Sequence, residues 1–182
     1  MNPIARRSLL ALIGPLALGA AAHLATARAE EKPAEVKLVP VKHAALLKRI
    51  ASDKAAKLTI VDAWATWCGP CKENFPHVVE MDRKFAGKGL VVISLSLDDP
   101  TKPKKLTEAA DFLKGQKAAF ANYVLDETAD DAFEKLNITA IPAVFLFGPD
   151  GKEIRRFTLE DVNNQFTYDQ VEKFVADYLA SH

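Results

Sequence analysis

The sequence predicts an α/β fold with a central mixed β-sheet flanked by helices. Short apolar runs rich in β-branched residues alternate with segments of helical periodicity, a pattern typical of parallel strands joined by helices. The last two strand-like runs are separated only by a Pro–Asp–Gly turn at residues 149–151, so they are expected to form an antiparallel hairpin. A length of 182 residues, 49% of them hydrophobic and 26% charged, fits one globular domain with a short extension.

The expected elements follow from hydrophobic periodicity along the chain. Short apolar runs predict six strands, at about residues 36–39, 57–63, 90–97, 122–125, 143–147 and 153–157. Apolar side chains at three- and four-residue spacing predict five helices, at about residues 43–50, 72–85, 103–113, 128–136 and 168–179. No internal repeat interrupts this order, so residues 30–182 are expected to form one domain.

The N-terminal segment has the pattern of a secretory signal peptide. Arg6 and Arg7 precede an apolar run at residues 9–22, and small residues surround Arg28 at the expected cleavage site after Ala29. We therefore assign residues 1–29 to a signal peptide and expect an exported, periplasmic or otherwise extracytoplasmic protein. The pattern leaves open whether the signal is of the general secretory type, a twin-arginine signal or an uncleaved membrane anchor.

The only two cysteines, Cys68 and Cys71, lie in the motif Trp–Cys–Gly–Pro–Cys at residues 67–71, between an expected strand and an expected helix. The N-terminus of a helix carries partial positive charge and unpaired N–H groups, which stabilise a thiolate. Pro70 fits the first helical turn. A disulfide that closes so short a loop adds little stability. The motif therefore predicts a redox-active disulfide, with Cys68 as the exposed nucleophile and Cys71 as the more buried resolving thiol.

Composition and spacing argue against a metal centre and against nucleic-acid binding. A structural zinc site needs four ligands, and the four histidines are scattered along the chain at His23, His43, His77 and His182. The 24 basic residues are balanced by 24 acidic residues, so the basic excess of a nucleic-acid-binding protein is missing. We expect no metal and no other cofactor.

Two segments resemble a known family. Residues 61–76 (VDAWATWCGPCKENFP) resemble the active-site segment of thioredoxin, and residues 141–154 (IPAVFLFGPDGKEI) resemble the cis-proline segment and following hairpin of the TlpA/ResA group of exported thioredoxin-like proteins. The resemblance extends over about residues 36–179. It implies a thioredoxin fold with a strand–helix insertion, at about residues 98–136, before the cis-proline strand.

The resemblance also implies roles for individual residues. Asp62 matches the buried aspartate of thioredoxin, which helps to move the proton of the resolving cysteine; a carboxylate in an apolar strand is costly to bury, and burial raises its pKa. Residues at five positions are implied to contact substrate: Trp67, Gly69, Pro70, Ile141 and Pro142.

Two positions depart from the family pattern. ResA-like proteins have a glutamate three residues after the second cysteine, where this chain has Asn74, preceded by Glu73. Thioredoxin has a lysine near its buried aspartate, at a strand position that corresponds to Ser94 here. These differences leave the role of Glu73 open and predict a pKa for Asp62 that differs from that of thioredoxin.

The predicted function is thiol–disulfide exchange that reduces disulfides of exported proteins. The resemblance implies protein disulfide or dithiol substrates and a membrane electron donor of the DsbD or CcdA type, and we expect a monomer. The Gly–Pro dipeptide between the cysteines is that of the reductant thioredoxin, but the same fold also includes strong oxidants. The alternatives are a copper or cytochrome-assembly binding module of thioredoxin fold, or a thiol peroxidase.

Overall fold

The computed structural model describes residues 35–160, 163 and 165–182. The expected signal peptide at residues 1–29 lies outside the described residues.

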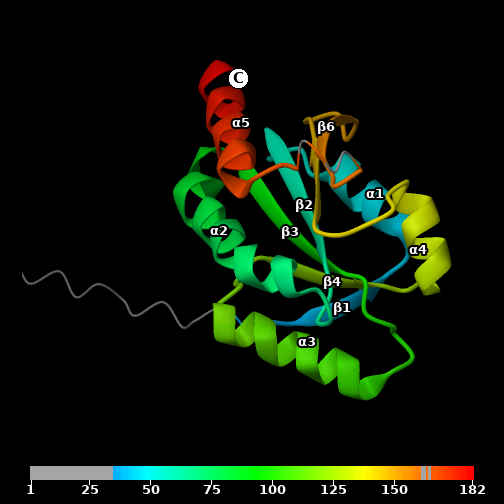
Figure 1. Cartoon of the computed structure of the whole chain (residues 1–182). Coiled ribbons are helices and arrows are strands. Elements are labelled where there is room, and N and C mark those ends of the chain that lie inside the picture. The colour runs from blue at the N-terminus through cyan, green and yellow to red at the C-terminus, as the bar shows by residue number, and fades with distance from the viewer. Residues whose placement is uncertain (1–34, 161–162, 164) are drawn as a thin grey trace, which may run out of the picture. The chain divides into compact units, whose positions relative to one another are not determined.

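The described strands form one six-stranded sheet in the order β1-β4-β3-β2-β5-β6 (Figure 1). Parallel pairing joins β1 to β4, β4 to β3 and β3 to β2, whereas β5 runs antiparallel to both β2 and β6. The predicted mixed sheet is therefore confirmed. The strands are β1 (Leu38–Val41), β2 (Leu58–Trp64), β3 (Leu90–Ser96), β4 (Ala121–Leu125), β5 (Ala143–Phe147) and β6 (Glu153–Phe157).

In the described part of the chain, five α-helices flank the sheet, with α2, α3 and α5 on one face and α1 and α4 on the other (Figure 1). Right-handed crossovers between parallel strands explain the placement of α1, α2 and α3. The chain moves across the sheet in one direction from β2 through β3 to β4, and in the opposite direction from β1 to β2. The helices are α1 (His43–Ser52), α2 (Gly69–Phe85), α3 (Pro103–Gln116), α4 (Ala129–Leu136) and α5 (Tyr168–Ser181), and a short 3₁₀ helix spans Ala86–Lys88.

The core surrounds the central strand β2, in which all seven residues are buried. Between the sheet and the helices α2 and α5, a cluster of buried side chains includes Ile60, Val78, Val144 and Val171. A strand that is buried on both faces reads as a continuous apolar run. The single carboxylate in this run, that of Asp62, therefore lies in the interior of the protein.

The elements agree with the predicted order and differ mainly at their ends. Helix α2 begins at Gly69 rather than at residue 72, because Cys68 is its N-cap residue and Pro70 occupies its first turn. Strand β1 is shifted to Leu38–Val41, where its pairing with β4 sets the register. The interval of the predicted insertion contains α3, β4 and α4.

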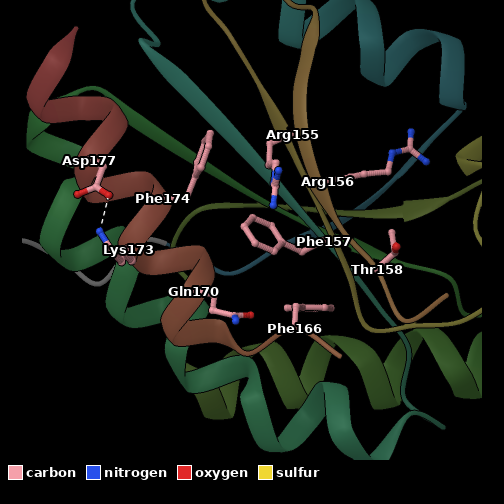
Figure 2. Close-up of a pocket in the computed structure, with 9 residues that line it drawn as sticks. All are labelled: Arg155, Arg156, Phe157, Thr158, Phe166, Gln170, Lys173, Phe174 and Asp177. Atoms are coloured by element: carbon pink, nitrogen blue, oxygen red, sulfur yellow. Dashed lines mark hydrogen bonds and ion pairs between the residues drawn. The ribbon is translucent and has the colours of Figure 1, made fainter. Parts of the chain in front are cut away.

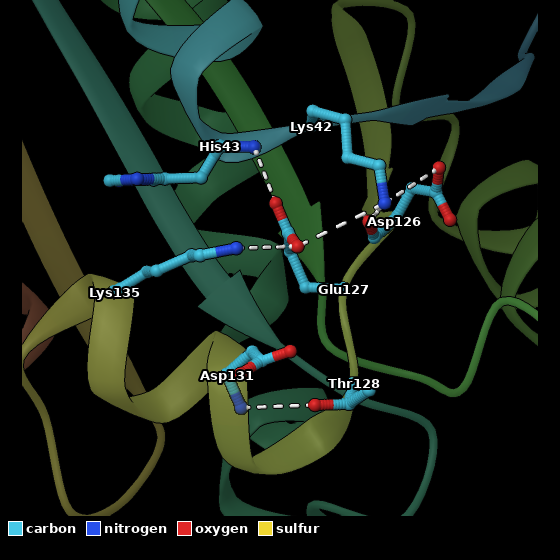
Figure 3. Close-up of polar contacts among 7 residues, drawn as sticks. All are labelled: Lys42, His43, Asp126, Glu127, Thr128, Asp131 and Lys135. Atoms are coloured by element: carbon cyan, nitrogen blue, oxygen red, sulfur yellow. Dashed lines mark hydrogen bonds and ion pairs between the residues drawn. The ribbon is translucent and has the colours of Figure 1, made fainter.

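A polar cluster attaches the insertion to the first helix (Figure 3). The N-cap residue of α1, Lys42, offers no capping side chain, and the Glu127 carboxylate instead accepts a hydrogen bond from the His43 backbone N–H at 3.3 Å. Lys135 of α4 donates to the same carboxylate at 2.6 Å. Because the positive end of the α1 dipole favours a negative charge, Glu127 stabilises α1 and holds α4 beside it.

Candidate active site

Strand β2 leads directly into the cysteine motif. Its last residue, Trp64, is buried, and its ring packs against Phe75 of α2 and Phe112 of α3, with ring centroids 5.4 and 4.9 Å away. The chain then turns, and the turn is closed by a hydrogen bond from the Cys68 N–H to the Ala65 carbonyl at 3.0 Å. The motif is thus held between a buried strand and the first turn of α2.

Cys68 and Cys71 form a disulfide, with their Cα atoms 5.3 Å apart. The Cys71 backbone N–H points at the Cys68 sulfur, 3.2 Å away. This N–H is one of the first-turn donors that have no partner within the helix. Once the disulfide is reduced, the same N–H and the helix dipole favour the thiolate form of Cys68.

Both sulfurs are shielded in this disulfide state. Cys71 is fully buried and Cys68 is only 5% exposed, so the expectation of an exposed Cys68 is wrong. The covering group is the segment before Pro142, because the Cys68 sulfur lies 3.8 Å from the Ile141 carbonyl oxygen. The Ile141–Pro142 peptide bond is cis, as the family resemblance implies.

The five expected substrate contacts fall into two groups. Trp67 is 58% exposed, and Gly69 and Pro70 beside it are also exposed. Ile141 and Pro142 are buried. The structure brings the Ile141 backbone next to Cys68 and places the Trp67 side chain at the surface beside the same cysteine.

Asp62 is fully buried at the centre of the sheet, where its register partners are Ser94 on β3 and Val144 on β5. Burial raises the pKa of Asp62 to about 7, while a hydrogen bond from the Tyr168 hydroxyl acts in the opposite direction. That hydroxyl donates to Asp62 Oδ1 at 2.5 Å. Among the described residues, Asp62 Oδ2 has no hydrogen-bond partner.

Ser94 does not take the place of the thioredoxin lysine as a partner of Asp62. Its hydroxyl donates instead to the side-chain oxygen of Asn122 on β4, at 2.8 Å. The partner of Asp62 comes from α5, in the form of Tyr168, which sequence reasoning missed. The two residues are 106 positions apart, and the only sequence signal was a tyrosine at the expected start of the last helix.

A second buried carboxylate, Asp98, fixes the loop that leads to the cysteines. It accepts hydrogen bonds from the Thr66 backbone N–H at 3.0 Å, from the Thr66 hydroxyl at 2.6 Å and from the Ser96 hydroxyl at 2.8 Å. Sequence reasoning placed Asp98 only at the start of the insertion. Because Thr66 lies two residues before Cys68, these bonds tie the loop before the cysteines to the segment that follows β3.

The two residues at the departure from the ResA pattern do not form a buried acidic site. Glu73 is exposed on α2. The side-chain amide of Asn74 donates to the Pro70 carbonyl at 2.9 Å, within the first turn of the same helix. Neither Glu73 nor Asn74 therefore provides a second buried carboxylate like that of Asp62.

Other features of the described residues lie outside this site. A pocket of about 460 Å³ between β6 and α5 is lined by aromatic and basic side chains, including Phe157, Phe166, Phe174 and Arg155 (Figure 2). Within the described part of the chain, no group of three or more histidine, cysteine, aspartate or glutamate side chains is arranged to hold a metal ion. None of the described helices combines the length and the apolar character that crossing a membrane requires.

Comparison with known proteins agrees with this geometry. Residues 56–153, more than half of the chain, match a family model described as thioredoxin-like. The thiol-disulfide oxidoreductase ResA of Bacillus subtilis is 28% identical over 112 residues, which cover 61% of this chain and 59% of that protein. The chain thus spans about three fifths of the length of this relative.

Solved structures with the same fold include two bacterial proteins. A thiol:disulfide interchange protein of the thioredoxin family from Chlorobium tepidum superposes with a TM-score of 0.54 at 20% identity, over 71% of this chain and 84% of that one. StoA from Bacillus subtilis superposes with a TM-score of 0.51 at 20% identity, over 68% of this chain and 85% of that one. The sheet order, the Cys68–Cys71 motif and the family match lead to one conclusion: the chain belongs to the thioredoxin-like family.

Proposed function

We propose that this protein is a thiol–disulfide oxidoreductase that reduces disulfides of exported proteins by dithiol exchange. The observation that carries the proposal is the Cys68–Cys71 pair at the N-terminus of α2, with the Cys68 sulfur against the Ile141 carbonyl. The relatives that are named thiol-disulfide oxidoreductases support this activity.

Cys68 starts the reaction in the reduced protein. Its thiolate attacks one sulfur of a substrate disulfide, and the other substrate sulfur leaves as a thiolate with the bonding electron pair. The product is a mixed disulfide between Cys68 and the substrate. The exposed Trp67, Gly69 and Pro70 form the surface on which the substrate docks, and the Ile141 backbone lies where an extended substrate segment pairs beside the sulfur.

Cys71 completes the reaction. Its thiol loses a proton to the Asp62 carboxylate, and the resulting thiolate attacks the Cys68 sulfur of the mixed disulfide. The substrate has then gained two electrons and leaves as a dithiol, and the Cys68–Cys71 pair has lost two electrons and forms a disulfide. A base with a pKa of about 7 is suited to this proton transfer near neutral pH.

The proposed location of the protein is outside the cytosol. The signal-like pattern at residues 1–29 supports an extracytoplasmic location, where disulfides persist. The oxidised pair then needs a donor of two electrons outside the cytosol, and we propose a membrane carrier of the DsbD or CcdA type. We further propose that the protein acts as a monomer on protein substrates.

Single-cysteine variants test the proposal directly. The reduced protein is mixed with dithiobis(nitrobenzoate), and the release of thionitrobenzoate is followed by absorbance. Wild type is expected to release two equivalents, one in each step. Cys71→Ser is expected to release one and to retain a stable mixed disulfide on Cys68, whereas Cys68→Ser loses the rapid first release.

The controls separate folding from chemistry. Circular dichroism of both variants establishes that the fold is retained, because a disulfide across so short a loop contributes little stability. Equal rates for Cys68→Ser and wild type, or a Cys71→Ser variant that still releases two equivalents, contradict the proposed roles.

A further inference from the structure

The hydrogen bond between Tyr168 and Asp62 joins two buried side chains that are 106 residues apart in the sequence. Tyr168 is the first residue of α5 and is 3% exposed, and its hydroxyl donates to Asp62 Oδ1 at 2.5 Å. A capping box formed by Thr167 and Gln170 fixes the start of α5 and therefore the position of Tyr168. The contact belongs to a well-defined part of the fold.

The two oxygens of Asp62 have different surroundings. Oδ1 accepts the Tyr168 hydroxyl, whereas Oδ2 is buried with no hydrogen-bond partner among the described residues. A buried polar atom without a partner is uncommon and calls for an explanation. An oxygen that is left free is able to take up a proton, while the other oxygen is held in place by the tyrosine.

The surroundings of Asp62 leave Tyr168 as its main polar contact. The neighbouring strands present Ser94, whose hydroxyl is bonded to Asn122, and the apolar Val144. Helix α2 contributes His77, whose exposed ring stacks on Tyr168 with centroids 6.0 Å apart. The other charged residues of α2 and α5 lie on exposed or half-buried positions: Lys72, Glu73, Glu80, Asp82, Arg83, Lys84, Asp169, Glu172, Lys173 and Asp177.

Tyr168 and burial act on Asp62 in opposite directions. Burial raises the pKa of Asp62, and the hydrogen bond from Tyr168 lowers it because it favours the charged carboxylate. The hydroxyl itself remains a donor, since burial and the nearby Asp62 raise the pKa of Tyr168 well above its ordinary value. In thioredoxin-type chemistry this leaves a base that is still partly ionised at neutral pH.

We propose that Tyr168 is a positioning residue for the resolving step: its hydroxyl holds Oδ1 of Asp62 in the ionised form and leaves Oδ2 free to take the proton of Cys71. The inference rests on the proposed dithiol exchange. In this step the Cys71 proton moves to Oδ2, the Cys71 thiolate bonds to the Cys68 sulfur, and the substrate thiolate leaves with its electron pair. Tyr168 keeps its own proton throughout, and Asp62 later returns the acquired proton to solvent.

The second release of thionitrobenzoate reports the attack of Cys71 on the mixed disulfide. Its rate is measured with the full chain from pH 5 to pH 9. In Tyr168→Phe, we expect the midpoint of the pH–rate profile to move up by about one pH unit, because the bond to the charged form is lost. A shift of this size slows the second release roughly fivefold at pH 7 and restores it near pH 9. The first release, which depends on Cys68, remains unchanged.

Tyr178→Phe is the matched control. It removes a hydroxyl from the same helix α5 at a half-buried position, where the ring stacks on Phe174 and His182, and it is expected to leave the profile unchanged. Asp62→Asn is expected to abolish the pH dependence, and adding Tyr168→Phe to it is expected to have no further effect on the profile.

Several outcomes overturn the inference. The inference is wrong if the pH–rate profile of Tyr168→Phe superimposes on that of wild type. It is also wrong if the second release of Tyr168→Phe is slow and stays slow at high pH. If Tyr168→Phe does not fold, the wild-type protein still gives a test by NMR: the resonance of the Tyr168 ring carbon bonded to oxygen must shift with a midpoint near that of Asp62. No shift between pH 5 and pH 9 contradicts the inference. Absence of a second release from wild type refutes the proposed function itself.

Discussion

Two buried carboxylates lie near the carboxyl ends of β2 and β3, and they differ in how fully they are hydrogen-bonded. Asp98 is 1% exposed and accepts bonds from Thr66 and Ser96 on both of its oxygens. Asp62 is fully buried, and among the described residues its carboxylate has one hydrogen-bond partner, the Tyr168 hydroxyl, on one oxygen. A buried carboxylate with several donors is stabilised where it lies, whereas one with few donors is costly to ionise.

The difference in hydrogen bonding fits a structural role for Asp98 and the proposed proton-transfer role for Asp62. Asp98 holds Thr66, and through it the loop before Cys68, in one position. Asp62 is left with a pKa of about 7, so it exchanges a proton with its surroundings near neutral pH. In the proposed mechanism, Asp98 fixes the loop before the cysteines and Asp62 is the base.

The largest expected effect comes from removing the charge of Asp62. Its pKa is about 7 in the folded protein and 3.8 in its ordinary state. Folding therefore favours the protonated carboxyl. Its contribution to the free energy of unfolding is fully present below about pH 4 and is lost as the pH rises towards 7. A difference of about three pH units corresponds to about 4 kcal/mol.

Asp62→Asn is expected to remove this pH-dependent loss. The free energy of unfolding of the variant should exceed that of wild type by up to about 4 kcal/mol at pH 8, and the gap should close towards pH 4. Urea denaturation of the oxidised proteins at several pH values measures it. If the free energies of unfolding of wild type and Asp62→Asn change with pH in the same way, Asp62 is not a buried carboxyl with a raised pKa.

Asp98→Ala is expected to act in the opposite direction. It leaves the Thr66 N–H and two hydroxyls without their acceptor, so we expect a loss of about 3 kcal/mol in the free energy of unfolding. Asp98→Asn retains one acceptor oxygen and should lose less. If Asp98→Ala is as stable as wild type in urea denaturation, Asp98 is not the anchor of the cysteine loop.

Thr66→Val is a smaller change in the same network. It keeps the shape of the side chain and the backbone N–H, and it removes only the hydroxyl bond to Asp98, so we expect a loss of about 1.5 kcal/mol. The matched control is Thr107→Val, which removes an exposed hydroxyl bonded to the Pro103 carbonyl and should change stability by less than about 0.5 kcal/mol. Equal losses for the two variants in thermal denaturation argue against a special role for Thr66.

Features that are encoded locally were predictable from the sequence. The strand–motif–helix arrangement around residues 67–71 and the final hairpin are signalled by periodicity and turn residues, and the structure has them at or near the predicted positions. The burial of Asp62 was predictable for the same reason, since its neighbours in the strand are apolar. The α/β class with a mixed sheet also followed from these patterns, whereas the thioredoxin fold and the cis bond before Pro142 followed from the family resemblance; all are present.

Contacts made by distant segments were not predictable in this way. Tyr168 reaches Asp62 across 106 residues, and Asp98 reaches Thr66 across 32. Both contacts depend on how helices and loops pack against the sheet, which no local pattern records. The buried position of Cys68 has the same origin, because the group that covers it, the Ile141 carbonyl, is 73 residues away.

The most direct test of the central claim is the redox equilibrium of the Cys68–Cys71 pair. The full chain is equilibrated in dithiothreitol buffers of graded ratio, and the fluorescence of Trp67, which is 58% exposed beside Cys68, reports the state of the pair. We expect one reversible two-electron transition near the potential of thioredoxin, about −270 mV. A potential near about −120 mV contradicts the proposed reducing direction, and failure to form a reversible disulfide contradicts the redox function altogether.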